Sequence, residues 1–155
     1  MSTKEIDAIT LLTKDHAEVK AMFKEYEGLT KRATVGKKKL ATQICNSLTL
    51  HAMLEEEIFY PAVRAAIKDE DLMDEAVVEH ASVKELIAQV ESMEPGDDLY
   101  DAKLKVMSEQ VEHHVREEEG EMFPMVRKTN LDLVSMGHEM SARKAEVASS
   151  KVGTI

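Results

Sequence analysis

Cysteine, proline and glycine are scarce in this sequence, which has one, three and six of them among 155 residues. The single cysteine, Cys45, excludes an internal disulfide and any zinc site built from several cysteines. Few prolines and glycines, together with many Ala, Leu, Met, Glu and Lys residues, favour an all-α protein. No apolar run approaches 18 residues and the first residues lack the apolar core of a signal peptide. We therefore expect a cytoplasmic protein without a membrane partner.

Basic residues are outnumbered, because 20 Lys and Arg stand against 30 Asp and Glu, for a formal net charge of −10. No basic stripe is available to neutralise phosphate groups, so we expect no nucleic acid partner. An acidic surface favours solubility, although acids that turn inward can instead hold a cation. The hydrophobic content of 43% in 155 residues is enough for a single domain, residues 1–155, with a packed core.

Apolar residues recur every three or four positions in four long segments, which predicts four amphipathic helices. The stripes cover residues 6–26, 40–62, 73–90 and 104–125, and turn-forming residues separate them at 28–36, 68–71 and 94–98. Short connections make neighbouring helices antiparallel, so the expected fold is an antiparallel up-down four-helix bundle with its core at about 6–127. A weaker stripe predicts a short additional C-terminal helix at about 131–148.

The chain also repeats itself in two halves. Residues 15–27 align with residues 79–91 at an offset of 64, and residues 51–64 align with residues 114–127 at an offset of 63. Each half is predicted to be a helical hairpin, with one histidine on its first helix and His-x-x-x-Glu on its second. Two similar hairpins that pack together are naturally related by a pseudo-two-fold axis.

A histidine lies within each of the four apolar stripes, and a glutamate follows two of these histidines four residues later. The resulting candidate metal ligands are His16, His51, Glu55, His80, His114 and Glu118. Residues four apart share one face of a helix, so each His-x-x-x-Glu pair can serve one site. If the axis passes between the two His-x-x-x-Glu helices, both glutamates can bridge two metals about 3.5–4 Å apart. His16 and His51 would complete one metal, and His80 and His114 the other. Imidazole and carboxylate ligands suit iron, with manganese and zinc as alternatives.

Each of these residues also has a structural interpretation. A lone histidine on an apolar stripe is often an ordinary core residue, and a metal-free bundle that acts through its surface is the alternative to a metal site. Four further glutamates in the same runs are expected on a solvated face: Glu56, Glu57, Glu117 and Glu119. Glu55 and Glu118 instead share the apolar stripes, and buried carboxylates are costly without a positive partner. A metal site is therefore the favoured interpretation.

Several neighbouring residues are not expected to bind metal. His113 and His138 are interpreted as surface residues. Tyr26 and Tyr60 are interpreted mainly as core packing, with a place in a pocket wall as the alternative. Pro61 and Pro124 follow the two His-x-x-x-Glu pairs at matching positions. Each removes a helical hydrogen bond, so each is expected to kink its helix or to mark its last turns.

Taken together, these motifs resemble the hemerythrin-like proteins with the HHE cation-binding domain. The resemblance covers about residues 11–127, and the tail is also similar to the closing helix of that family. It implies an up-down four-helix bundle around a non-heme di-iron centre, in which two carboxylates and an oxo or hydroxo group bridge two iron ions. The small molecules O2, NO and H2O2 are then the expected ligands. The fifth histidine of the oxygen carriers is missing here, because Ala76 and Lys84 stand where it would neighbour His80.

Fewer protein ligands leave more metal positions open, which favours reactivity over reversible storage of O2. We therefore expect a di-iron protein that reacts with peroxide, nitric oxide or O2 in redox-stress defence, and catalase-like or NO-consuming turnover is a hypothesis. The alternative is an O2, NO or iron sensor or carrier without turnover. Delivery of iron for cluster repair ranks last, because the chain has only Cys45. The chemistry of ferritin-like bundles is disfavoured, since no Glu-x-x-His occurs.

Overall fold

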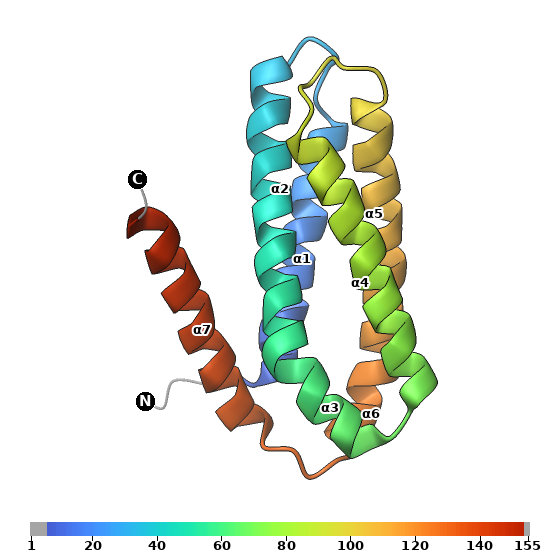
Figure 1. Ribbon diagram of the computed structural model, residues 1–155, viewed down its shortest axis with the longest axis vertical. Helices are drawn as coiled ribbons and strands as arrows, with labels where there is room; N and C mark the ends of the chain where they lie inside the picture. Colours follow the sequence, from blue (N-terminus) through green and yellow to red (C-terminus); the bar gives the residue numbers. More distant parts are fainter. Residues whose placement is uncertain (1–5, 154–155) are drawn as a thin grey trace.

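The computed structural model describes residues 6–153, and within this range all the regular elements are helical (Figure 1). Four rods form the bundle: α1 (Ala8–Glu27); α2 (Thr34–Leu54), continued by η1 (Glu55–Phe59) and α3 (Tyr60–Ile67); α4 (Glu70–Glu91); and α5 (Tyr100–Glu117), continued by η2 (Glu118–Met122) and α6 (Phe123–Arg127). Successive rods run antiparallel, which confirms the predicted all-α up-down four-helix bundle. The last helix, α7 (Leu133–Gly153), packs outside the bundle against α1 and α2.

Two of the rods begin at an aspartate that caps the helix. The Asp7 carboxylate accepts a hydrogen bond of 2.8 Å from the Thr10 backbone N–H, and Asp69 accepts one of 3.1 Å from Leu72. Such caps satisfy backbone donors that have no partner within the first turn. Two of the three loops are shorter than the sequence predicts, because α2 and α4 begin inside the segments 28–36 and 68–71, whereas the third extends beyond the predicted 94–98.

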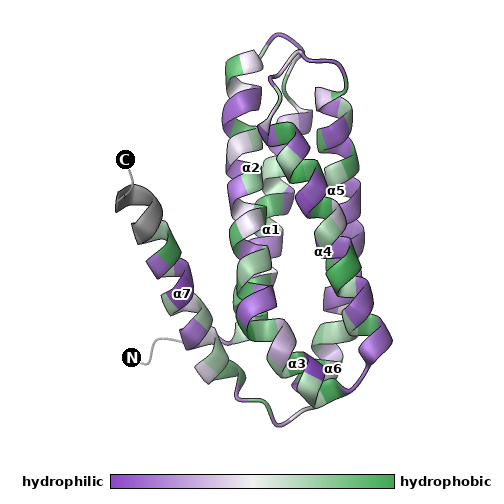
Figure 2. Ribbon diagram, in the orientation of Figure 1, coloured by the Kyte–Doolittle hydropathy of each residue, from purple (hydrophilic) through white to green (hydrophobic). Residues whose placement is uncertain are grey.

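A polar layer divides the bundle core into two apolar clusters. Along α1 one cluster contains Leu12 and the other contains Phe23, with His16 between them. The other three rods have the same arrangement, because each carries one buried histidine between a segment in one cluster and a segment in the other. Apolar positions, green in Figure 2, line the rods on both sides of this layer. The bundle therefore encloses its polar residues between two dry layers, where unpaired charge is costly.

The tail helix is longer than predicted. The expected element was a short helix at about 131–148, whereas α7 spans Leu133–Gly153. Its buried contact is made near its start by Met136 and Met140, and Gly137 lies between them. A Cβ atom at Gly137 would lie 2.4 Å from the Ile6 carbonyl oxygen, so only glycine allows α7 to approach the chain this closely. Residues 141–149 of α7 are largely exposed, and the apolar stripe of the helix is correspondingly weak in the sequence.

No helix within residues 6–153 combines the length and the apolar character that are needed to cross a membrane. Figure 2 shows hydrophilic positions, in purple, recurring along every labelled rod of the bundle.

Candidate metal centre

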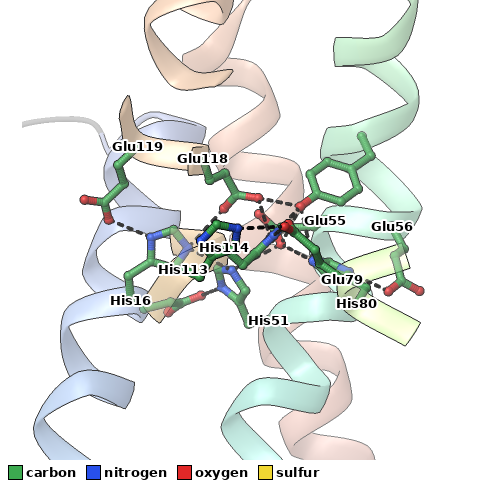
Figure 3. A network of polar contacts seen from close by, with 12 residues as sticks. His16, His51, Glu55, Glu56, Glu79, His80, His113, His114, Glu118 and Glu119 are labelled. Carbon is green, nitrogen blue, oxygen red and sulfur yellow. Dashed lines mark hydrogen bonds and ion pairs between the residues drawn. The ribbon is translucent and has the colours of Figure 1, made fainter. Parts of the chain in front are cut away.

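The six predicted ligands lie together in the polar layer, and all of them are buried (Figure 3). The structure places their ligand atoms in two groups, each within 4.8 Å: His16, His51, Glu55 and Glu118 form one, and Glu55, His80, His114 and Glu118 form the other. Both groups contain the two glutamates, which is the arrangement expected of carboxylates that bridge two cations. Each group adds one histidine from a His-x-x-x-Glu helix and one from the neighbouring helix of the same hairpin.

The inner nitrogen of every histidine faces the carboxylates. Nε2 of His16 lies 3.1 Å from Glu118 Oε1, and Nε2 of His51 lies 3.3 Å from Glu55 Oε1. In the second group the corresponding distances are 3.0 Å from His80 to Glu55 Oε1 and 3.1 Å from His114 to Glu118 Oε2. The Nε2 atoms of His16 and His51 are only 3.2 Å apart. Imidazole lone pairs and carboxylate oxygens thus converge from four helices.

The outer nitrogen of every histidine is paired with a further carboxylate. The Nδ1 pairs are His16 with Glu119 (2.7 Å), His51 with Asp15 (3.0 Å), His80 with Glu56 (2.8 Å) and His114 with Glu79 (2.6 Å). An Nδ1–H that donates to a carboxylate leaves the lone pair of a neutral imidazole on Nε2, directed into the layer. This pairing is common for histidines that bind metals, where it fixes the ring and raises its basicity.

Two of these outer carboxylates have a role that the sequence did not predict. Glu56 and Glu119 were expected on a solvated face, and their side chains are 35% and 39% exposed, but each is also hydrogen-bonded to a histidine of another helix. Both immediately follow a predicted bridging glutamate, and they match each other at the offset of 63 that relates the two halves. Asp15 and Glu79 likewise precede the first histidine of each half. An acidic residue at the same position of both halves was the sequence signal that could have identified these four carboxylates.

Two buried carboxylate oxygens lack a hydrogen-bond partner among the described residues: Glu55 Oε2 and Glu118 Oε1. The second lies 3.1 Å from His16 Nε2, yet the two atoms do not have the geometry of a hydrogen bond. Buried acceptors without donors are costly, and two buried carboxylates are more costly still unless positive charge accompanies them. Cations between the oxygens and the Nε2 atoms would satisfy both, so the donor set fits a metal site.

The electrostatics of the layer agree with this reading. Burial alone would lower the pKa of His51, but the charge of Glu55 and the hydrogen bonds that Asp15 and Glu55 accept from His51 outweigh it and raise the pKa to about 10. Burial likewise opposes protonation of His114, whose pKa the adjacent Glu118 carboxylate raises to about 10. Burial would raise the pKa of Glu118, yet His114 and His16 hold it well below its usual range. The site therefore attracts positive charge strongly, whether protons or metal ions supply it.

Tyr60 reaches the same layer, although the sequence favoured a core-packing role for it. Its hydroxyl oxygen lies 3.2 Å from His80 Nε2, 3.1 Å from His114 Nε2 and 3.2 Å from Glu55 Oε1. It also donates a short hydrogen bond to Glu118 Oε2. One hydroxyl cannot donate to four acceptors, so this oxygen stands where the second group of ligands converges. A phenolic oxygen can serve there as a further ligand.

A local widening of the helix explains why the periodicity did not reveal Tyr60. In a regular α-helix a residue five positions after Glu55 points about 140° away from it. Here the chain forms a π-helical turn, η1, in which the Tyr60 N–H donates to the Glu55 carbonyl five residues back. Pro61 lacks an N–H and its ring disfavours a regular α-helical turn before it. The prolines were expected to kink their helices or to mark their last turns, and each lies in the short last segment of its rod, α3 or α6. Each also follows a π turn at a candidate ligand glutamate, which the sequence did not predict.

The two halves differ at this position. Phe123 is the counterpart of Tyr60 at the offset of 63, and it likewise follows a π turn, η2. Its ring stacks on His16, with ring centroids 6.0 Å apart and planes inclined by 1°. One half of the layer therefore carries a hydroxyl and the other an apolar ring, so the two groups of ligands are chemically unequal.

The remaining candidate residues lie outside the layer. His113 is 62% exposed at its side chain and lies 3.0 Å from Glu117 Oε1, as expected for a residue on the flank of the helix. His138 is exposed on α7. Tyr26 is buried in the other half of the bundle, where its hydroxyl donates to Asp101 at 2.7 Å. The exposure of His113 and His138 and the packing of Tyr26 agree with the predictions. His113 also lies with Glu79 and Glu117 in a partly exposed group of possible metal ligands.

Comparisons with known proteins agree with the fold and with the donor set. A solved hemerythrin HHE cation binding domain-containing protein from Mycobacterium kansasii has a TM-score of 0.79 and 21% sequence identity, and the match covers 95% of this chain and 90% of that one. A curated protein named DNA nickase, from Nostoc sp., is 29% identical over 138 residues, which are 89% of this chain but 38% of that protein. This chain thus spans well under half the length of that relative. The family description hemerythrin HHE cation binding domain matches residues 7–126, so the chain belongs to the hemerythrin HHE cation-binding family.

Proposed function

We propose that the chain is a non-heme di-iron protein. In this proposal His16 and His51 would hold one iron, His80, His114 and Tyr60 would hold the other, and the two glutamates, which belong to both groups, would serve both irons. The two groups of converging ligand atoms support it, as does the membership in a cation-binding family. A phenolate oxygen next to imidazoles and carboxylates favours iron over softer metals.

We further propose that the protein disproportionates hydrogen peroxide in redox-stress defence, by the overall reaction 2 H2O2 → 2 H2O + O2. Iron, when bound, supplies the chemistry by changing between its ferrous and ferric states. The observation that carries this proposal is the group of His16 and His51, which together with the two glutamates offers only four protein ligands and so leaves positions open for peroxide. Near His80, Ala76 packs in the apolar core and Lys84 pairs with Glu56, so neither adds an imidazole.

The role of the chain in this reaction is to hold the ligands and to exclude water. The four outer carboxylates fix the histidine rings through Nδ1, so that every Nε2 atom stays directed into the layer. The apolar clusters on both sides keep the layer dry, which strengthens its electrostatic interactions. Tyr60 would hold the iron through its phenolic oxygen, as a phenolate.

An oxygen electrode tests the proposed turnover on protein reconstituted with ferrous iron. We expect many molecules of O2 released per chain after hydrogen peroxide is added, and none from zinc-loaded protein. A single colour change without sustained release of O2 would contradict the enzyme and leave the second candidate.

That second candidate is a sensor or carrier of O2 or NO without turnover. It is favoured by the contact of α7 with the site, because Lys144 donates to Asp15, which in turn pairs with the ligand His51. A change at the site could then reach a surface helix. This function predicts a spectral change on addition of O2 or NO that reverses when the gas is removed.

The name of the Nostoc relative raises DNA cleavage as a third function. The formal net charge of −10 argues against it, because an acidic protein is repelled by the phosphate backbone of DNA. We therefore do not extend that activity to this chain.

A further inference from the structure

A cavity of about 190 Å³ lies inside the bundle next to the polar layer. Its walls are aliphatic side chains from all four rods: Val19, Leu48, Val83, Ile87 and Val111. The rings of the four inner histidines line it as well, so it ends at the candidate metal centre. The exposed lining residues Thr49, Lys84 and Glu91 place its mouth between α2 and α4.

The chemistry of the walls selects the kind of molecule that this space receives. The valine, leucine and isoleucine side chains offer no hydrogen bonds to water or to hydrogen peroxide, so this part of the cavity favours an apolar occupant. Small polar molecules find hydrogen-bond partners only at the histidine end and at the polar mouth. An engineered cavity of about 150 Å³ with similar walls binds benzene, whereas O2 and NO are far smaller than the space. The best occupant therefore has an apolar body of several carbons and a polar end that faces the histidines.

We infer that this cavity binds the alkyl group of a short organic hydroperoxide, whose O–O–H end then faces the four imidazoles. The inference rests on the proposed function and deepens it, because it names a substrate class for the same site. With hydrogen peroxide as the reductant the overall reaction is ROOH + H2O2 → ROH + H2O + O2. The O–O bond of the organic hydroperoxide breaks, and hydrogen peroxide gives up two electrons and two protons to become O2.

Binding is tested with 1-pentanol, which has the alkyl group and a polar end but no O–O bond. Calorimetric titration of the iron-loaded protein should show saturable binding, and the affinity should rise about four-fold for each CH2 from propanol to pentanol. Val83→Phe places a ring in the cavity, and we expect it to weaken pentanol binding about ten-fold or more while the metal content stays the same. The matched control is Val106→Phe on α5, at a position that is 42% exposed and does not line the cavity.

Val111→Leu fills less of the cavity than Val83→Phe does, and it takes the place of that variant in the test if Val83→Phe does not fold. Absence of pentanol binding to the wild-type protein, or equal binding to the folded cavity variants, would overturn the inference. Consumption of hydrogen peroxide without pentanol binding would overturn the inference alone and leave the proposed function standing. Pentanol binding to a loaded protein that consumes no peroxide of any kind would overturn the proposed function, and the hydroperoxide assignment with it.

Discussion

Lys144 on the tail helix donates a hydrogen bond of 2.8 Å to Asp15, whose other carboxylate oxygen lies 3.0 Å from His51 Nδ1. A side chain outside the four-helix bundle thus helps to hold a candidate metal ligand. The other three histidines are paired with Glu56, Glu79 and Glu119, all from the bundle rods. The contact connects α7 to the metal centre.

The first prediction concerns this contact. Lys144→Met removes the donor to Asp15, so the carboxylate should hold His51 less firmly. Changes to groups that orient metal ligands commonly cost about 10- to 100-fold in metal affinity, and we expect about 10-fold here, measured by titration against a chelator. Arg143→Met is the control, because Arg143 pairs with Glu57 and Glu146 rather than with an orienting carboxylate. Equal affinity in the two variants would show that α7 does not influence the site.

The second prediction separates the ligands from their neighbours in sequence. Glu118→Ala or His114→Ala should lose about half of the bound metal or more, because a bridge or one side of the site is gone. His113→Ala should keep its metal, since that side chain is mainly exposed. Metal analysis of the purified variants checks both expectations. Loss of metal from His113→Ala together with retention by His114→Ala would be the contrary result.

The third prediction concerns the tyrosine of the layer. Tyr60→Phe should fold, because Phe123 already occupies the matching position in the other half. We expect the ferric protein with Tyr60 to absorb in the visible range through charge transfer from phenolate to iron, and Tyr60→Phe to lose that band. Phe123→Leu is the control, and its visible band should persist. An unchanged visible spectrum in Tyr60→Phe would mean that the hydroxyl does not bind metal.

The fourth prediction is a pH dependence of the metal-free protein. Burial opposes protonation of His51 and His114, but the interactions with the surrounding carboxylates outweigh burial and raise the folded-state pKa of each histidine to about 10. The pKa of histidine in the unfolded state is about 6.5, so between about pH 6.5 and pH 10 the folded state holds protons that the unfolded state has lost. The stabilisation is therefore complete below about pH 6.5 and is lost as the pH rises through about 10. Urea midpoints should fall over this range without metal and change much less with metal bound, and midpoints that rise with pH would contradict the assignment.

Helical periodicity was sufficient to predict the bundle and the six candidate ligands. His51 and Glu55 lie four residues apart within one apolar stripe, and a regular α-helix places such residues on one face. Their register could be read because the second half repeats the pattern at a fixed offset. The structure brings all six residues together, as this reasoning requires.

The parts that could not be predicted depend on irregular backbone or on contacts between helices. Tyr60 enters the layer because η1 is wider than an α-helix, and no periodicity of 3.6 residues anticipates that. Glu56 and Glu119 lie next to ligand glutamates and point toward a neighbouring rod, so their role depends on how the rods pack. The length of α7 was underestimated, because up to residue 149 its buried residues are confined to a short stretch around Met136 and Met140.

The most direct test of the central claim is the iron content of the purified, reconstituted protein, measured together with its ultraviolet and visible spectrum. The account predicts two iron ions per chain, a near-ultraviolet band from a bridged ferric pair, and a visible phenolate band. One iron per chain, or zinc or no metal in place of iron, would contradict the claim that the polar layer is a di-iron centre.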